Sequence, residues 1–147
     1  MQGPYHDFFI CESNKDINSF LGKKSDFRID DDLFRYFSDF FQWIKIYNPS
    51  TKAYHYNFNY WGISIIEKND CKSFLEILLG LEKIFLVAPV NFSLNVGYEF
   101  IDKKKNGEYI YNQYEKEYIL KIIINLIEYC NIVLNSEKEI AILHFGV

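Results

Sequence analysis

Apolar residues recur at helical spacing in three segments of the chain, and the first of these follows a run of three aspartates. One side of this segment carries Leu33, Phe37, Phe40, Phe41 and Ile44. A carboxylate at the start of a helix caps free backbone N–H groups and lies at the positive end of the helix dipole. We therefore predict a helix that Asp30-Asp31-Asp32 opens and Asn48-Pro49-Ser50 stops.

Two further helices are predicted, and the second of them is long. One begins at Asn69-Asp70, with Phe74, Leu75, Leu78 and Leu81 on its apolar side. We expect it to run into a short strand over residues 84–87, which Pro89 ends. The other spans about 114–134, with an apolar stripe made of Ile119, Ile123, Leu126, Ile127, Cys130 and Leu134. Further isoleucines and leucines widen this stripe, so we expect this helix to be largely buried.

Strict alternation of apolar and polar residues in NFSLNVGYEF predicts a strand over residues 91–100. Its apolar residues, Phe92, Leu94, Val96, Tyr98 and Phe100, are expected to point one way. Asn106-Gly107 predicts a two-residue hairpin turn beside a charged tip, Lys103-Lys104-Lys105. That turn places Lys105 opposite Glu108 and sets Tyr109 and Tyr111 on the face of Phe100. We expect the 114–134 helix to cover this face.

The stretch YHYNFNYWGISII, residues 54–66, combines six aromatic rings with small polar residues and is predicted to be one strand. Rings that stack on nucleic-acid bases lie beside basic residues, and Lys52 is the one basic residue near this stretch. Aromatic side chains also favour half-buried pleated surfaces. We expect these rings mainly to pack in the core. A protein interface is the alternative, because tyrosine suits half-wet surfaces.

Shorter strand patterns occur at residues 8–11 and 27–29, and EIAILHFGV is typical of a closing strand. With three prolines and seven glycines in 147 residues, no linker divides the chain. The sequence therefore predicts one domain, 1–147, of the α+β class. Its architecture is expected to be an antiparallel or mixed sheet packed by about three helices.

The charge balance argues against polyanionic partners. The chain has 16 basic and 20 acidic residues, a net charge of −4. Nucleic-acid and anionic-membrane binders carry basic patches, so we expect neither partner. A basic protein is a suitable partner, because complementary charges speed encounter.

Residues with catalytic or metal-binding chemistry are few. Cys11, Cys71 and Cys130 lack ligand spacing, and no nucleophile, phosphate-binding or metal motif occurs. Cys130 is expected to be a small buried hydrophobe, and His144 a hydrogen-bonded structural imidazole. We expect no catalysis, no metal and no cofactor. The chain start has no signal-peptide pattern, and charged or amide residues interrupt the most apolar segment, so a cytoplasmic location without a membrane span is expected.

Several segments together resemble an immunity protein of a bacterial polymorphic-toxin or contact-dependent growth-inhibition system. They are YWGISII, the helix SFLEILLGL, IFLVAP with NFSLNV, and the closing AILHFGV. The resemblance implies a small, cytosolic, non-catalytic inhibitor. Such a protein binds a cognate toxin domain, often a basic nuclease, and occludes its active site or an exosite. The chain itself would be a monomer or a homodimer.

On this interpretation, acidic residues steer the partner and aromatic residues anchor it. The candidates for steering are Asp26, Asp30, Asp31, Asp32 and Asp39. The candidates for anchoring are Tyr54, Tyr56, Tyr60 and Trp61. Each aspartate also has a structural interpretation, as a helix cap or a solvated charge. A different class of function remains open: a small-ligand-binding or regulatory α+β domain with an aromatic-lined pocket of ~300–1,000 Å³.

Overall fold

The computed structural model describes residues 4–12, 17–101 and 106–147, and its fold is α+β. The elements in chain order are β1 (Tyr5–Glu12), the 3-10 helix η1 (Ile17–Phe20), β2 (Arg28–Asp30), α1 (Asp31–Phe41), β3 (Lys45–Asn48), β4 (Ala53–Tyr56), β5 (Ile63–Ile66), α2 (Lys68–Leu86), β6 (Asn91–Phe100), β7 (Gly107–Glu115), α3 (Lys116–Asn135) and β8 (Ile140–Phe145). The predicted class is confirmed. The predicted lysine tip at 103–105 lies outside the described residues.

Six strands form one sheet in the order β2-β1-β8-β5-β3-β4, and neighbouring strands are antiparallel. The predicted strands near 8–11, 27–29 and the chain end are confirmed as β1, β2 and β8. The last strand lies inside the sheet, between β1 and β5. This position explains its nearly unbroken apolar sequence, because both of its faces are covered.

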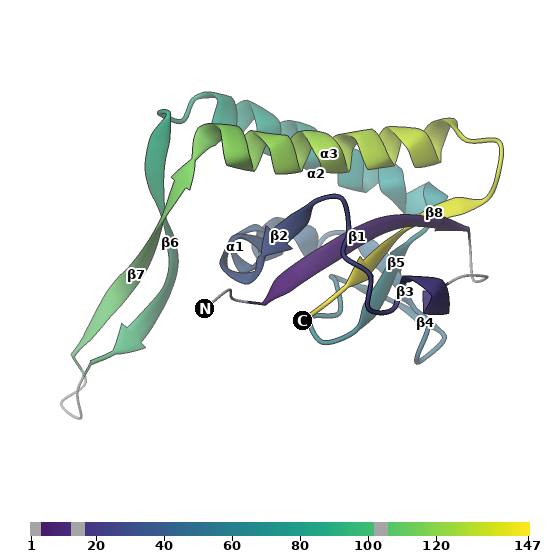
Figure 1. Ribbon diagram of the computed structural model, residues 1–147, viewed down its shortest axis with the longest axis horizontal. Coiled ribbons are helices and arrows are strands. Elements are labelled where there is room, and N and C mark those ends of the chain that lie inside the picture. Colours follow the sequence, from purple (N-terminus) through teal and green to yellow (C-terminus); the bar gives the residue numbers. More distant parts are fainter. Residues whose placement is uncertain (1–3, 13–16, 102–105) are drawn as a thin grey trace.

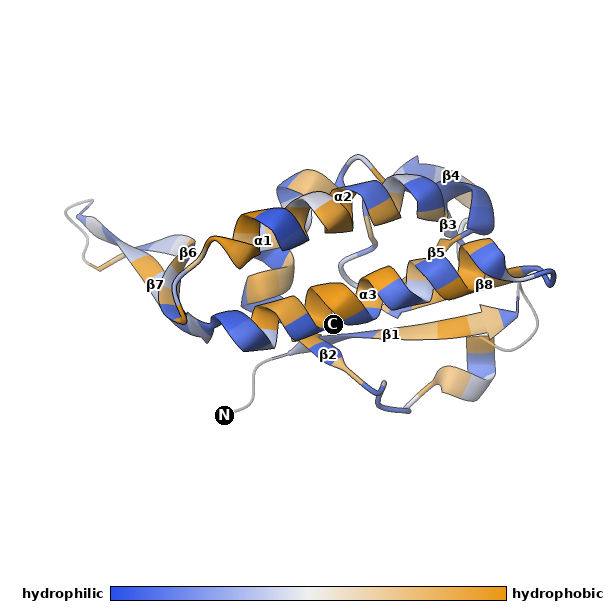
Figure 2. Cartoon of the chain, turned by 90° about the horizontal axis from the view of Figure 1, so that it is seen from above, coloured by the Kyte–Doolittle hydropathy of each residue, from blue (hydrophilic) through white to orange (hydrophobic). Residues whose placement is uncertain are grey.

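Helices α2 and α3 lie side by side over one face of this sheet, and α1 lies at the end nearest the β6–β7 hairpin (Figure 1). Apolar and polar residues alternate in bands along α2 and α3, as expected for helices with one buried side (Figure 2). The main core lies between the helices and the sheet and includes Phe8, Phe37, Phe41, Ile66, Phe74, Leu78, Ile119, Ile123, Leu126 and Ile142. A smaller cluster on the opposite face packs against Ile17 and Phe20 of η1.

The long C-terminal helix is confirmed as α3, and its packing partner differs from the expectation. Ile123 and Cys130 are fully buried, as predicted, while Ile124 is exposed. The helix packs against α2 and does not cover the hairpin as expected. The reason is that α2 offers a long apolar side of its own, on which Cys71 approaches Cys130.

Two predicted boundaries are wrong, each for its own physical reason. The expected strand at 84–87 is instead the last turn of α2 and the residue after it, because Phe85 continues the helical spacing of Leu78 and Leu81 into the core. Helix α1 ends at Phe41, before the expected stop. The segment after it forms β3, a strand whose short length hides its alternation.

The hairpin of β6 and β7 is confirmed, but its register is not the one that a two-residue turn imposes. Glu99 lies opposite Glu108, in place of Lys105. A β-bulge between Asn95 and Gly97 adds one unpaired residue to β6. Tyr98 and Phe100, after the bulge, therefore point to the face opposite that of Leu94, and the expected single apolar face of β6 is wrong.

The aromatic stretch is two strands, β4 and β5, and not the single strand predicted. Asn57 between them has φ of 76°, a left-handed conformation that asparagine tolerates. Phe58 turns into the core, whereas Tyr54, Tyr56 and Trp61 are exposed. The expectation that these rings pack mainly in the core is therefore wrong for Tyr54, Tyr56 and Trp61.

Candidate functional site

The first aspartate of the triplet is the cap of α1. The Asp30 carboxylate accepts a hydrogen bond from the Leu33 backbone N–H at 3.0 Å, as the sequence predicted. It also accepts hydrogen bonds from the hydroxyl groups of Tyr114 at 3.0 Å and Tyr118 at 3.2 Å. Burial, with the Asp30 charge second, raises the pKa of Tyr118 to about 12. The cap therefore also fastens α1 to β7 and α3.

The next two aspartates also have partners within the fold. Asp31 accepts hydrogen bonds from His6 Nε2 at 3.0 Å and from the Tyr60 hydroxyl. Asp32 accepts one from the side-chain amide of Asn112 at 2.6 Å. All three carboxylates are half-buried. They hold the start of α1 against β1, the 57–62 loop and the hairpin, which limits their freedom to steer a partner.

A buried polar chain continues from Asp31 into the sheet. His6 Nδ1 lies 2.9 Å from His144 Nε2, and His144 Nδ1 lies 3.3 Å from Ser64 Oγ. Burial lowers the pKa of His6, against the opposing effect of Asp31, and lowers that of His144 well below its usual value. Both imidazoles are therefore neutral at pH 7.

Serine, histidine and aspartate in series are the residue types of a catalytic nucleophile relay. This hydrogen-bonded series, however, has no access to solvent at Ser64 or at either histidine. Ser64, His144 and His6 are fully buried, and Ser64 Oγ already accepts the Asn59 backbone N–H at 2.7 Å. A nucleophile must contact its substrate. The arrangement is therefore structural, and the hydrogen-bonded imidazole predicted at His144 is confirmed.

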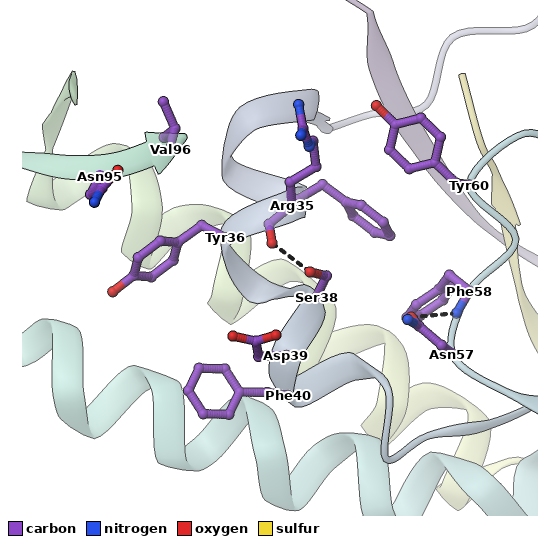
Figure 3. A pocket seen from close by; sticks show the side chains of 11 residues that line it. Arg35, Tyr36, Ser38, Asp39, Phe40, Asn57, Phe58, Tyr60, Asn95 and Val96 are labelled. Carbon is purple, nitrogen blue, oxygen red and sulfur yellow. Dashed lines mark hydrogen bonds between the residues drawn. The ribbon is translucent and has the colours of Figure 1, made fainter. Parts of the chain in front are cut away.

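A groove of about 630 Å³ crosses the outer side of α1. Figure 3 shows α1 between Asn95 and Val96 of β6 on one side and the 57–60 segment on the other. Helix α1 contributes Arg35, Tyr36, Ser38, Asp39 and Phe40. The groove thus combines a guanidinium, a carboxylate and aromatic rings on one short helix.

Both tryptophans of the chain lie beside this groove and are exposed. Trp61 is 79% exposed, and its ring lies 4.8 Å from that of Tyr60, which lines the groove. Trp43 is 61% exposed, with its ring 5.8 Å from that of Phe40, another lining residue. Tyr60 bonds the start of α1 and Phe40 lies near its end. Trp43 itself lines a neighbouring hollow, which shares Phe40 with the groove and includes Ile77 and Ile84 of α2.

We call this surface the α1 face: Arg35, Tyr36, Asp39, Phe40, Trp43, Tyr60 and Trp61. The 57–62 loop, which carries Tyr60 and Trp61, is held in place by hydrogen bonds from Gly146 and Val147. The Gly146 N–H donates to the Gly62 carbonyl at 2.8 Å, and the Val147 N–H donates to that of Tyr60 at 3.0 Å. A Cβ on Gly146 would overlap the Tyr60 carbonyl, so only glycine permits this approach.

The structure brings together some of the residues that the sequence nominated and separates others. Asp39, Tyr60 and Trp61 belong to the α1 face, and Asp31 bonds Tyr60 beneath it. Asp30 and Asp32 bond inward residues of the hairpin and α3.

The remaining candidates lie elsewhere. Tyr54 and Tyr56 are on the edge strand β4, where Tyr54 donates to Glu67 at 2.6 Å. Asp26 lies in a different hollow, near Tyr129. The sequence reasoning missed Arg35, Tyr36 and Trp43. The position of Trp43, just beyond the apolar stripe of α1, was a usable signal.

Comparison of the chain with protein family models, curated proteins and solved structures found no match. Within residues 4–12, 17–101 and 106–147, no helix has the length and apolarity to cross a membrane. In that same part of the chain, no three His, Cys, Asp or Glu side chains are grouped as metal ligands would be.

Proposed function

We propose that this chain is a non-catalytic inhibitor that binds a cognate bacterial toxin through the α1 face and occludes it. The exposure of both tryptophans beside one groove carries the proposal. Tryptophan is highly buried on average in folded proteins, and Trp, Tyr and Arg dominate the hot spots of protein interfaces. The α1 face offers Trp43, Trp61, Tyr36, Tyr60 and Arg35 together.

The partner proposed is basic, such as a nuclease domain, whose cleft must attract phosphate. The chain carries a net charge of −4. Asp39 lies in the groove and is exposed, and among the described residues its carboxylate has no hydrogen-bond or ion-pair partner. Its charge is therefore available to a cation of the partner. A stable complex would bury on the order of 1,200–2,000 Å², an area wide enough to cover a catalytic cleft.

Growth protection tests the proposal. The test requires a neighbouring gene for a large secreted protein, whose C-terminal domain would be expressed in a host from an inducible promoter. We expect the chain to restore growth and Trp61→Ala to lose that protection at equal protein abundance. A neighbouring toxin domain that kills equally with and without the chain would contradict the proposal, as would the absence of such a neighbour.

The groove also supports a second candidate, binding of a small ligand. Its volume of about 630 Å³ is that of a ligand pocket, and Arg35 and Asp39 offer opposite charges one helical turn apart. A zwitterionic metabolite suits such a pair. Thermal shift against a panel of amino acids and dipeptides decides: a saturable rise in melting temperature that Arg35→Ala abolishes supports this candidate, and no rise rejects it.

A further inference from the structure

The outer half of the β6–β7 hairpin projects beyond the body of the protein (Figure 1). Near the body, Leu94 and Tyr114 are buried. At the bulge and beyond it, four rings are 48–70% exposed: Tyr111 opposite Asn95, and then Tyr98, Phe100 and Tyr109. A two-stranded hairpin without a covering layer is marginally stable in water, so this half of the hairpin is short of packing partners.

The four rings share one face of the hairpin, which we call the ring face. Tyr98 lies directly opposite Tyr109, with ring centroids 5.1 Å apart, and contacts Phe100 at 5.4 Å. The Tyr98 ring also lies across Gly107, where a Cβ would overlap it. Three of the rings are therefore ordered by their mutual contacts, and Tyr111 follows Tyr109 on the same face of β7.

In the described part of this half of the hairpin, residues 97–101 and 107–111, the charged side chains are on the other face. Glu99 and Glu108 lie directly opposite each other there, next in register to the Tyr98 and Tyr109 pair. Successive side chains of a strand alternate between faces, so no charged side chain of the described hairpin residues falls among the four rings. Like charges placed directly opposite are unfavourable, and any surface that contained this pair would repel its own copy.

We propose that the ring face docks against the ring face of a second copy of this chain, forming a two-fold symmetric dimer. A two-fold interface brings identical residues together, so it requires a surface without net charge. The ring face meets this requirement although the whole chain is acidic. Tyrosine hydroxyls both donate and accept hydrogen bonds and are therefore complementary to themselves.

The area is sufficient for a weak dimer. Four rings with these exposures present on the order of 500 Å² per copy, or ~1,000 Å² for two, near the lower limit for a specific interface. Leu94 of the same hairpin packs inward, toward the body. The four rings are on the side of the hairpin opposite that of Leu94. The inference is independent of the proposed function.

Sedimentation velocity of the purified full-length chain over a wide concentration range tests the dimer. We expect a reversible monomer–dimer equilibrium that tightens as salt rises, because salt screens the repulsion between two acidic chains. Tyr98→Lys and Tyr98→Glu should each be monomeric with unchanged melting temperatures. Mixing the two variants in equal amounts should restore a dimer, because residue 98 of each copy then faces opposite charge.

Two controls separate this claim from others. Glu99→Gln, on the opposite face, and Trp61→Ala, on the α1 face, should both leave dimerisation within about twofold of wild type, a difference of ~0.4 kcal/mol. A chain that stays monomeric into the millimolar range would overturn the inference. So would a dimer that Tyr98→Lys leaves intact, or Lys and Glu variants that stay monomeric when mixed.

Discussion

The Nδ1 atom of His6 lies 2.9 Å from the Nε2 atom of His144, and both side chains are fully buried. One assignment of protons satisfies every hydrogen bond in the series from Ser64 through the two histidines to Asp31. Ser64 O–H donates to His144 Nδ1, His144 Nε2–H to His6 Nδ1, and His6 Nε2–H to Asp31. Each imidazole is neutral in this arrangement. This series of hydrogen bonds connects β1, β5 and β8 to the start of α1, where Asp31 also accepts a hydrogen bond from the Tyr60 hydroxyl.

Stability should depend on pH through these two histidines. Burial lowers the pKa of His6 and His144, so the folded protein binds fewer protons than the unfolded chain below the ordinary histidine pKa of 6.5. The free energy of unfolding is therefore expected to be level above pH ~7.5. It should fall toward pH ~5.5, by at most about 1.4 kcal/mol per pH unit for each histidine. Urea unfolding at several pH values measures this slope.

Single substitutions identify the source of the slope. His144→Gln should be less stable at pH 8 and should show a clearly shallower acid slope than wild type. His55→Gln is the matched control for the loss of a histidine outside the buried pair, because His55 is not fully buried and bonds a backbone carbonyl. Equal slopes in wild type and His144→Gln would show that the buried pair is not responsible.

Adjacent positions on α3 should differ sharply in their tolerance of charge. Ile123 is fully buried, while Ile124 is 48% exposed. Ile123→Asp places an unpaired carboxylate in the core and should cost at least about 4 kcal/mol or prevent folding. Ile124→Asp should cost less than about 1 kcal/mol. Thermal melting of both variants checks this, and similar melting temperatures would contradict the packing of α3.

The chain end should determine the position of the Trp61 loop. Gly146→Ala introduces a Cβ against the Tyr60 carbonyl and should cost about 1–3 kcal/mol by overpacking. Gly80→Ala is the matched control, because nothing surrounds its Cβ position on α2 and alanine favours a helix by ~0.5–1 kcal/mol. Trp61 fluorescence should change in the first variant and stay constant in the second. A stable Gly146→Ala protein with unaltered fluorescence would show that residues 146–147 do not fix the position of the Trp61 loop.

Electrostatic steering should depend on Asp39 more than on Asp26. Asp39 lies in the groove, and Asp26 lies in a separate hollow. Asp39→Asn should slow association with the toxin domain at low salt, and the difference should shrink as salt rises. Asp26→Asn should match wild type. Stopped-flow kinetics at two ionic strengths measures both, and equal slowing by the two variants would remove the α1 face from the encounter.

The sequence predicted the elements whose patterns are long or bounded by clear signals. Helix α3 and strand β8 were found because their apolar runs are extensive, and the Asp30 cap because carboxylates at a helix start have one common role. The pairing of α2 with α3 was missed. Nothing in an apolar stripe states which other apolar surface covers it, and that choice is made by the whole fold.

The candidate site was only partly predictable, because single residues changed the direction of whole segments. The bulge at Asn95 and Gly97 reversed the face of Tyr98, and the left-handed Asn57 divided one apparent strand into two. Residues such as Arg35 join the site through a groove formed by three segments that are distant in the sequence. Their proximity is a tertiary property that no local pattern encodes.

The central claim is that the α1 face binds a toxin, and the affinity of tryptophan variants tests it most directly. Titration calorimetry with the neighbouring toxin domain would compare wild type, Trp61→Ala, Trp43→Ala and, as a control on the hairpin, Tyr111→Ala. Both tryptophans are exposed, so their melting temperatures should be unchanged. We predict that each tryptophan variant weakens binding by about 30-fold or more, equal to ~2 kcal/mol, while Tyr111→Ala binds as wild type. Dissociation constants within about twofold of wild type for both tryptophan variants would contradict the claim.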